Sequence, residues 1–233
     1  MAVHRLQRLS SPSRSISLVI HALGIASFSY NFHFLTRWKT PIDDAYGWHF
    51  QFLTILSLIA SFIVFALAFL ADLTSSSVLF SAKNALSIIT TPLECLVTML
   101  YFGISAIDPE LVVPPDFKIP LLADLGFHFA PAAFLTLDLM LLSPPWTVSA
   151  PTVMALGTAI SLSYWYWVEL CFTHNGYYVY PLLGVLSTPQ RVMLFAGSAI
   201  WVTVSFAVLR AVYGRLNGYD SPTSKAAKRT KTA

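Results

Sequence analysis

Six apolar stretches, each about 20 residues long or longer, dominate the chain and leave little room for any other kind of fold. A helix needs roughly 20 mostly apolar residues to cross the hydrocarbon core of a bilayer. We therefore expect an all-α protein, a polytopic membrane bundle of about six transmembrane helices. The stretches are residues 15–35, 49–71, 85–107, 119–142, 150–172 and 191–213.

The composition agrees with this pattern and excludes several classes of protein. Hydrophobic residues make up 56% of the 233 residues and charged residues only 11%, whereas soluble domains carry about 25% charged residues. Too little polar surface remains for a soluble enzyme, a disordered regulator or a coiled coil. The net charge of +3 does not form a basic patch for nucleic acid, so we expect no nucleic-acid partner.

Basic residues at the two ends predict the orientation of the bundle. We expect a basic cytosolic N-terminus over residues 1–14, a transmembrane domain over 15–213, and a basic, disordered tail over 214–233. Lysine and arginine favour the cytosolic side, so both termini are predicted to be cytosolic, which requires an even number of spans. An alternative reads the first stretch as a signal peptide, because three arginines precede it.

Ionisable side chains inside the predicted spans are costly and usually face the bundle interior. For His21, Glu94 and Asp138 the simplest interpretation is a packed or hydrogen-bonded structural role. Glu169 lies close to a polar and aromatic segment that holds His174 and Tyr180. That segment is typical either of an interfacial aromatic belt or of the mouth of a cavity.

Two polar residues are predicted to share one level of the membrane. Thr54 lies five residues into the second stretch and His128 nine residues into the fourth, about 8 and 14 Å along helices that run in the same direction. A hydroxyl and a neutral imidazole are the minimum for nucleophilic acyl transfer, because the histidine takes the proton of the hydroxyl. Alternatively, Thr54 bonds only to the backbone of its own helix.

Several short blocks, in order between residues 46 and 197, resemble the androgen-induced-gene family, which includes the androgen-dependent regulator of tissue factor pathway inhibitor. The blocks are GWHFQFLT at 47–54, LADL at 70–73, GFH at 126–128 and GYYVYP at 176–181, with Asp138 where the family has an acid. The resemblance implies an intramembrane hydrolase of fatty acid esters of hydroxy fatty acids. It implies Thr54 as nucleophile and His128 as general base. Gln51 replaces the family's basic residue.

The expected partners and supporting residues follow from the same comparison. The substrate is expected to be an apolar lipid ester that enters from the bilayer, in the endoplasmic reticulum or another endomembrane. No metal or cofactor is implied by any motif. The alternatives are a non-catalytic lipid-binding scaffold or regulator and a small transporter. Residues expected to support the site or line a cavity are His49, Asp138, Glu169, His174 and Tyr180.

Overall fold

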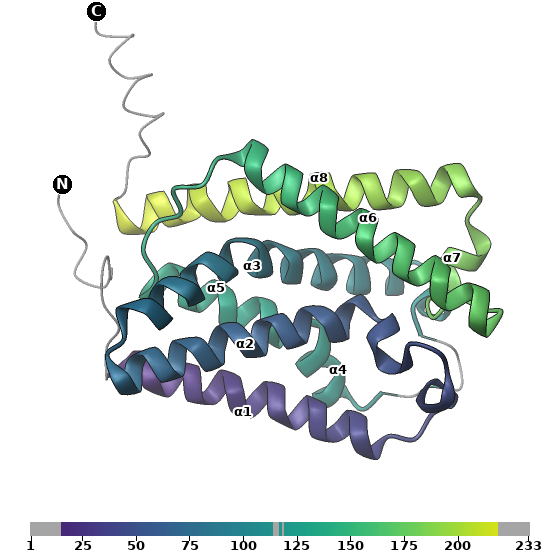
Figure 1. The fold of residues 1–233 in the computed structure, drawn as a ribbon, viewed down its shortest axis with the longest axis horizontal. Helices are drawn as coiled ribbons and strands as arrows, with labels where there is room; N and C mark the ends of the chain where they lie inside the picture. Colours follow the sequence, from purple (N-terminus) through teal and green to yellow (C-terminus); the bar gives the residue numbers. More distant parts are fainter. Residues whose placement is uncertain (1–14, 114–116, 118, 219–233) are drawn as a thin grey trace, which may run out of the picture.

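The computed structural model describes residues 15–113, 117 and 119–218, and this part of the chain is helical with no strand (Figure 1). The predicted N-terminal segment 1–14 and most of the predicted tail lie outside the described residues. The long helices are α1 (Ile16–Arg37), α2 (Leu53–Thr74), α3 (Ser77–Ser105), α6 (Ala150–Asn175) and α8 (Thr188–Asn217). The shorter ones are α4 (Leu121–His128), α5 (Ala130–Leu142), α7 (Pro181–Val185), and the 3-10 turns η1 (Pro41–Asp44), η2 (Trp48–Gln51) and η3 (Pro109–Leu111).

The all-α prediction is confirmed, and the expected number of about six spans is approximate. Among the described residues, α1, α2, α3 and α8 are long and apolar enough to cross a membrane, and the bent pair α4–α5 makes a fifth candidate. Helix α6 has 26 residues but falls outside this set. Its second half carries a run of aromatic residues, 164–167, that lowers its hydropathy. It packs along α8.

The fourth predicted span is bent rather than straight. Helices α4 and α5 meet at an angle of 46°, and Phe129 between them leaves helical geometry. Pro131 follows in the first turn of α5. Proline has no N–H group and clashes with the carbonyl four residues before it, which kinks or breaks a helix at this point.

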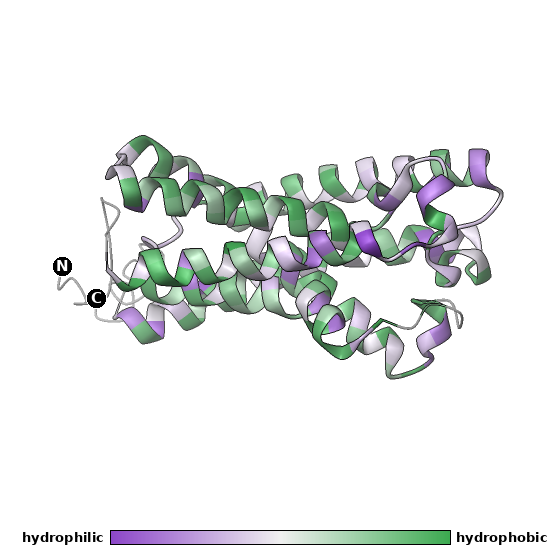
Figure 2. Ribbon diagram, turned by 90° about the horizontal axis from the view of Figure 1, so that it is seen from below, coloured by the Kyte–Doolittle hydropathy of each residue, from purple (hydrophilic) through white to green (hydrophobic). Residues whose placement is uncertain are grey.

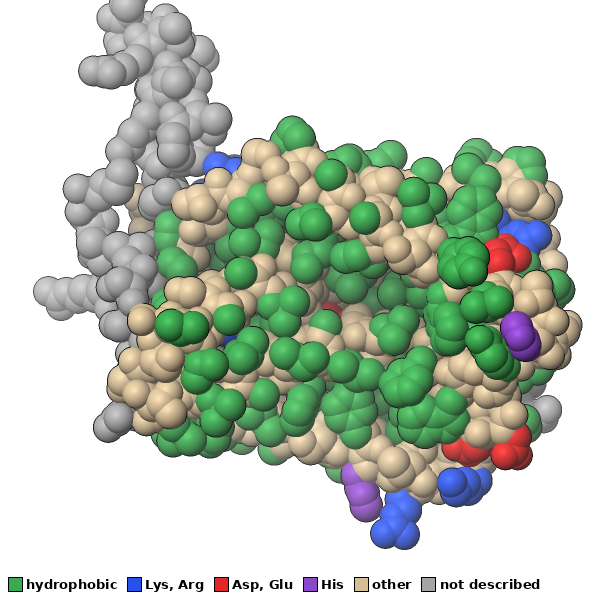
Figure 3. All heavy atoms as spheres, in the orientation of Figure 1, with side chains coloured by type: hydrophobic (Ala, Val, Ile, Leu, Met, Phe, Trp, Pro, Cys, Tyr) green, Lys and Arg blue, Asp and Glu red, His purple; other side chains and the backbone are tan. Residues whose placement is uncertain are grey.

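Apolar side chains cover the outside of the bundle as well as its core. Val19, Leu162 and Val208, on three different helices, are each more than half exposed. Figure 2 shows hydrophobic residues along the length of the helices, and Figure 3 shows them spread over one face with charged groups gathered toward an end. Exposed apolar surface on this scale marks a membrane-facing protein.

A buried ionic network ties four helices together at the end of the bundle where α2 ends. His21 on α1 lies 2.8 Å from Asp72 on α2 and 2.9 Å from Asp138 on α5, one contact through each ring nitrogen. Lys83 on α3 lies 2.7 Å from both Asp138 and Ser143. Two carboxylates thus face one ammonium and one imidazole. A doubly protonated His21 ring satisfies every contact and balances the charges.

Candidate active site

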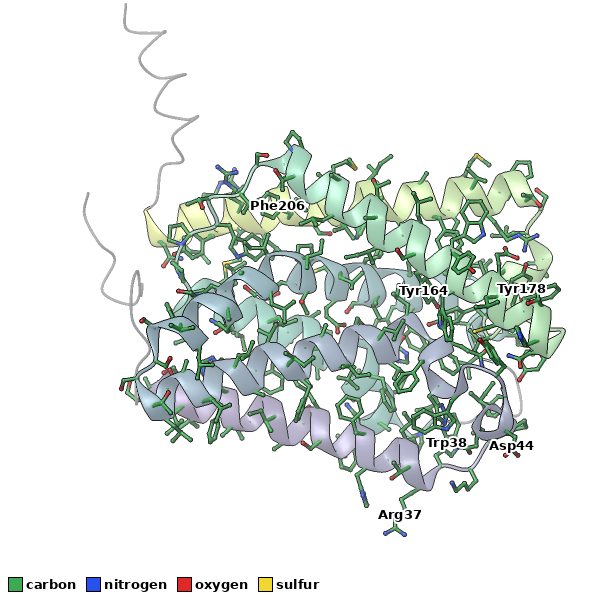
Figure 4. The ribbon with its side chains drawn as sticks, viewed as in Figure 1. Arg37, Trp38, Asp44, Tyr164, Tyr178 and Phe206 are labelled. Atoms are coloured by element: carbon green, nitrogen blue, oxygen red, sulfur yellow. The ribbon has the colours of Figure 1, made fainter. Side chains whose placement is uncertain are left out.

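Thr54 is the second residue of α2 and is 92% buried. The chain before it is held by α6, because the Tyr164 hydroxyl donates to the Gln51 carbonyl at 2.7 Å and accepts from the Leu53 N–H at 3.0 Å (Figure 4). The Asn175 amide adds a 3.0 Å bond to the Gln51 side chain. The sequence predicted that this span begins at residue 49. Helix α2 begins four residues later, at Leu53, because residues 48–51 form the turn η2.

The surroundings of the Thr54 hydroxyl are polar on one side only. The Tyr180 hydroxyl lies within hydrogen-bonding reach of the Thr54 hydroxyl and of the Thr54 backbone. The first N–H groups of a helix have no acceptor within that helix, so the Thr54 N–H points out of the start of α2. One turn deeper, the Ser57 hydroxyl donates to the Thr54 carbonyl at 3.1 Å.

His128 is the last residue of α4, and contacts to its ring and to its backbone hold it in place. Its Nδ1 lies 2.9 Å from a carboxylate oxygen of Asp124 and 3.1 Å from the Asp124 carbonyl. Both are acceptors, so Nδ1 carries the hydrogen, and in the neutral ring the lone pair is on Nε2. Tyr101 stacks on the ring with centroids 3.4 Å apart and hydrogen-bonds to Asp124. Thr98 on α3 donates to the His128 carbonyl at 2.6 Å.

Two cavities meet at Thr54. The first, named here the His128 cavity, is lined by Leu35, Trp38, Thr40, Ile42, His49, Phe52, Thr54, Ile55, Tyr101, Val112, Val113, Phe117, Ile119, Phe127, His128, Val179 and Tyr180. Thr54 and His128 therefore face the same space. No hydrogen bond joins them in the described part of the chain, and catalytic contacts of this kind often shorten only when substrate binds.

The second and larger cavity, named here the apolar cavity, lies between α3, α6 and α8. Its walls include Leu93, Val97, Ile160, Leu194, Ser198 and Val202, and it contains Thr54 but not His128. Thr54, Tyr101, Val112 and Tyr180 line both cavities. The candidate nucleophile thus stands at the junction of two spaces with mostly apolar walls.

A second histidine faces the His128 cavity. The ring of His49 is 1% exposed, and its Nε2 lies 3.2 Å from the Asp43 carboxylate. Trp48 also donates to Asp43, at 3.3 Å. Burial lowers the pKa of His49 below its ordinary value although the Asp43 carboxylate opposes this effect, so the ring is neutral at pH 7.

Three of the residues predicted to support the site lie elsewhere in the described structure. Asp138 belongs to the buried ionic network. Glu169 accepts hydrogen bonds from Trp165, Tyr178 and Arg191, and His174 stacks on Tyr46 with centroids 3.9 Å apart. Of the five, only His49 and Tyr180 reach the cavities beside Thr54.

Sequence reasoning missed two residues that contact His128. Neither Asp124 nor Tyr101 was predicted to belong to the site. The signal for Asp124 was present, because residues four apart share a face of a helix. Tyr101 lies on α3 and reaches His128 only through tertiary packing.

The described residues contain no group of three or more histidine, cysteine or acidic side chains placed to hold a metal ion. The two cysteines are unpaired, Cys171 buried and Cys95 half-buried, as expected for packed thiols. The two cavities present hydroxyl and imidazole groups, and the Asp124 carboxylate contacts His128.

The fold and the cavities define a helical membrane protein with a buried polar site near one end of its bundle. The chain belongs to the FAR-17a/AIG1-like family, whose model matches residues 16–214. A UPF0641 membrane protein of Schizosaccharomyces pombe is 31% identical over 206 residues, which cover 87% of this chain and 92% of the relative. The androgen-induced gene 1 protein of Homo sapiens is 23% identical over 212 residues, covering 83% and 86%. No solved structure matches the chain.

Proposed function

We propose that this protein is an intramembrane hydrolase of fatty acid esters, with Thr54 as nucleophile and His128 as general base. One observation carries the proposal. Thr54 lines the same cavity as a histidine whose Nδ1 is bound to Asp124, so that its basic Nε2 is free for proton transfer. A nucleophile, a base and a group that orients the base are the parts that acyl transfer requires.

The reaction proceeds in two halves. In the first, the Thr54 oxygen attacks the ester carbonyl and His128 Nε2 takes the hydroxyl proton. The carbon–oxygen bond to the alcohol then breaks, and the imidazolium returns the proton to the departing oxygen. In the second half, water attacks the acyl-threonine, His128 takes a proton from that water, and Thr54 leaves with the proton as the fatty acid departs.

Two groups at the junction are suited to hold the negative charge of the intermediate. The Tyr180 hydroxyl and the Thr54 backbone N–H lie beside the Thr54 oxygen. Hydrogen-bond donors held in place before the reaction stabilise an oxyanion strongly where water is excluded. Tyr164 keeps this end of α2 in position through Gln51 and Leu53.

The substrate and location follow from the same proposal. The substrate is a lipid ester of the hydroxy fatty acid type, which enters from the bilayer, and the protein resides in the endoplasmic reticulum or a related membrane. Both termini are cytosolic, with residues 1–14, 15–213 and 214–233 as the three segments. The start of α1 and the end of α8 lie at the same end of the bundle (Figure 1), which supports placing both termini on one side of the membrane.

The ionic network gives little support to the alternative of a small transporter. Its members His21, Asp72, Lys83 and Asp138 line neither of the two cavities described above. An ion or substrate path would need them to meet an open space.

Asp124→Asn provides a graded test of the proposed function. Purified wild type should release fatty acid from a long-chain ester, and Asp124→Asn should lower kcat because it weakens the group that orients the base, by less than the about 10⁴-fold that follows when a catalytic triad loses its acid. The loss is limited because the Asp124 carbonyl still accepts from Nδ1. Asp44→Asn, an exposed carboxyl in the loop before α2 (Figure 4), should leave kcat unchanged. Absence of fatty acid release by wild type would eliminate the proposal.

A further inference from the structure

We propose that the two cavities divide the substrate at its ester bond, with the acyl chain in the apolar cavity and the departing alcohol in the His128 cavity. This inference rests on the proposed function and deepens it. It assigns opposite ends of one ester to opposite sides of Thr54. It also names the residues that set the preferred length of each end.

The direction of the substrate follows from the position of the base. In acyl transfer the histidine that deprotonates the nucleophile later protonates the departing oxygen, so the alcohol must lie on the histidine side. His128 lines one cavity and not the other, whereas Thr54 lines both. The acyl group stays on Thr54 after the alcohol has left, and the cavity that Thr54 lines and His128 does not is the apolar cavity.

The walls of the apolar cavity suit a long hydrocarbon chain. Along α3 they extend from Ile104 to Ile89, which is about 22 Å at the usual helical rise. The hydroxyls of Ser161 and Ser198 donate to carbonyls of α8, at 2.7 and 2.8 Å. These two polar groups in the wall therefore need no partner from the ligand, and a methylene chain meets no unsatisfied group there.

The His128 cavity differs in the chemistry of its walls. It adds the imidazoles of His49 and His128 and the hydroxyl of Thr40 to its apolar side chains. It is built largely from the segments before α2 and α4, so it lies toward the Thr54 end of the bundle. An alcohol that carries a further polar group fits this space better than it fits the apolar cavity.

Two single substitutions separate the cavities. Val97 lines only the apolar cavity and Val113 only the His128 cavity, so a phenylalanine at each position narrows one space. The substrates are two series of esters, one with acyl chains of four to sixteen carbons on a fixed alcohol, the other with alcohols of increasing length on a fixed acyl group. The measured quantity is the ratio of kcat/KM for the longest and shortest member of each series.

The expected result is a crossed pattern. Val97→Phe should lower the long-to-short ratio of the acyl series about tenfold or more and leave the ratio of the alcohol series unchanged. Val113→Phe should do the reverse. If Val97→Phe does not fold, Ser198→Leu takes its place, because Ser198 lines the same cavity from α8. It should also lower the long-to-short ratio of the acyl series alone.

The outcomes distinguish this inference from the function on which it rests. Suppose that wild type hydrolyses esters through Thr54 but Val97→Phe lowers the long-to-short kcat/KM ratio of the alcohol series and not that of the acyl series. The two ends of the substrate then occupy the opposite cavities, and the inference is overturned. Equal changes in both series would overturn it as well. If neither series is hydrolysed by wild type, the proposed function itself fails.

Discussion

Membranes that contain Thr54→Ala are expected to hydrolyse long-chain esters no faster than membranes without the protein. The substitution removes the attacking oxygen, and loss of a nucleophile lowers kcat by about 10⁴-fold or more in enzymes of this chemical type. Thr54 sits at the start of α2, where alanine is tolerated by the helix, so the fold should survive. Thr54→Ser retains a hydroxyl and should keep measurable activity.

A matched control lies one turn deeper on the same helix. Ser57 is fully buried, and its hydroxyl contacts the Thr54 carbonyl, but it lines neither cavity. Ser57→Ala should therefore retain kcat within a few-fold of wild type. If Thr54→Ala retained as much activity as Ser57→Ala, Thr54 would not be the nucleophile.

Lys83→Met is expected to have the largest effect on stability. Lys83 is 1% exposed and lies 2.7 Å from Asp138, so the substitution leaves an excess buried negative charge shared with His21. Removing one partner of a buried ion pair costs about 3–5 kcal/mol. The measurement is thermal unfolding of the purified protein in detergent, where the unfolding temperature should fall by many degrees.

The double variant Lys83→Met with Asp138→Asn separates charge imbalance from lost packing. Because it removes both charges, it should recover a substantial part of the lost stability. Lys39→Met, at an exposed lysine before α2, should unfold at the wild-type temperature. An unchanged unfolding temperature for Lys83→Met would mean that the network contributes nothing to the fold.

The sequence was sufficient to predict the apolar helices, because each needs only a run of residues that can be counted. It also predicted that Thr54 and His128 share one level of the membrane, since depth along a helix follows from residue number, and both line one cavity. The bend at Phe129 was harder to predict. Pro131 lies two residues beyond it, but the stretch 119–142 was predicted as one span.

The side-chain contacts between different helices could not be predicted from the sequence. Asp138 was expected either to support the site or to have a structural role, and only the packing of α1, α3 and α5 shows that it meets His21 and Lys83. Lys83 was not predicted to be buried or paired, because it precedes the predicted span 85–107. The rotation of each helix about its axis, which decides such pairings, depends on all its neighbours at once.

The acyl-threonine is the species that tests the central claim most directly. Purified protein would be mixed with a long-chain ester, quenched in acid within the first turnover, digested and analysed by mass spectrometry. The account predicts a peptide containing Thr54 that carries the mass of the acyl group, and no such peptide from Thr54→Ala. An acyl group on any other side chain, or hydrolysis without an acylated Thr54, would contradict it.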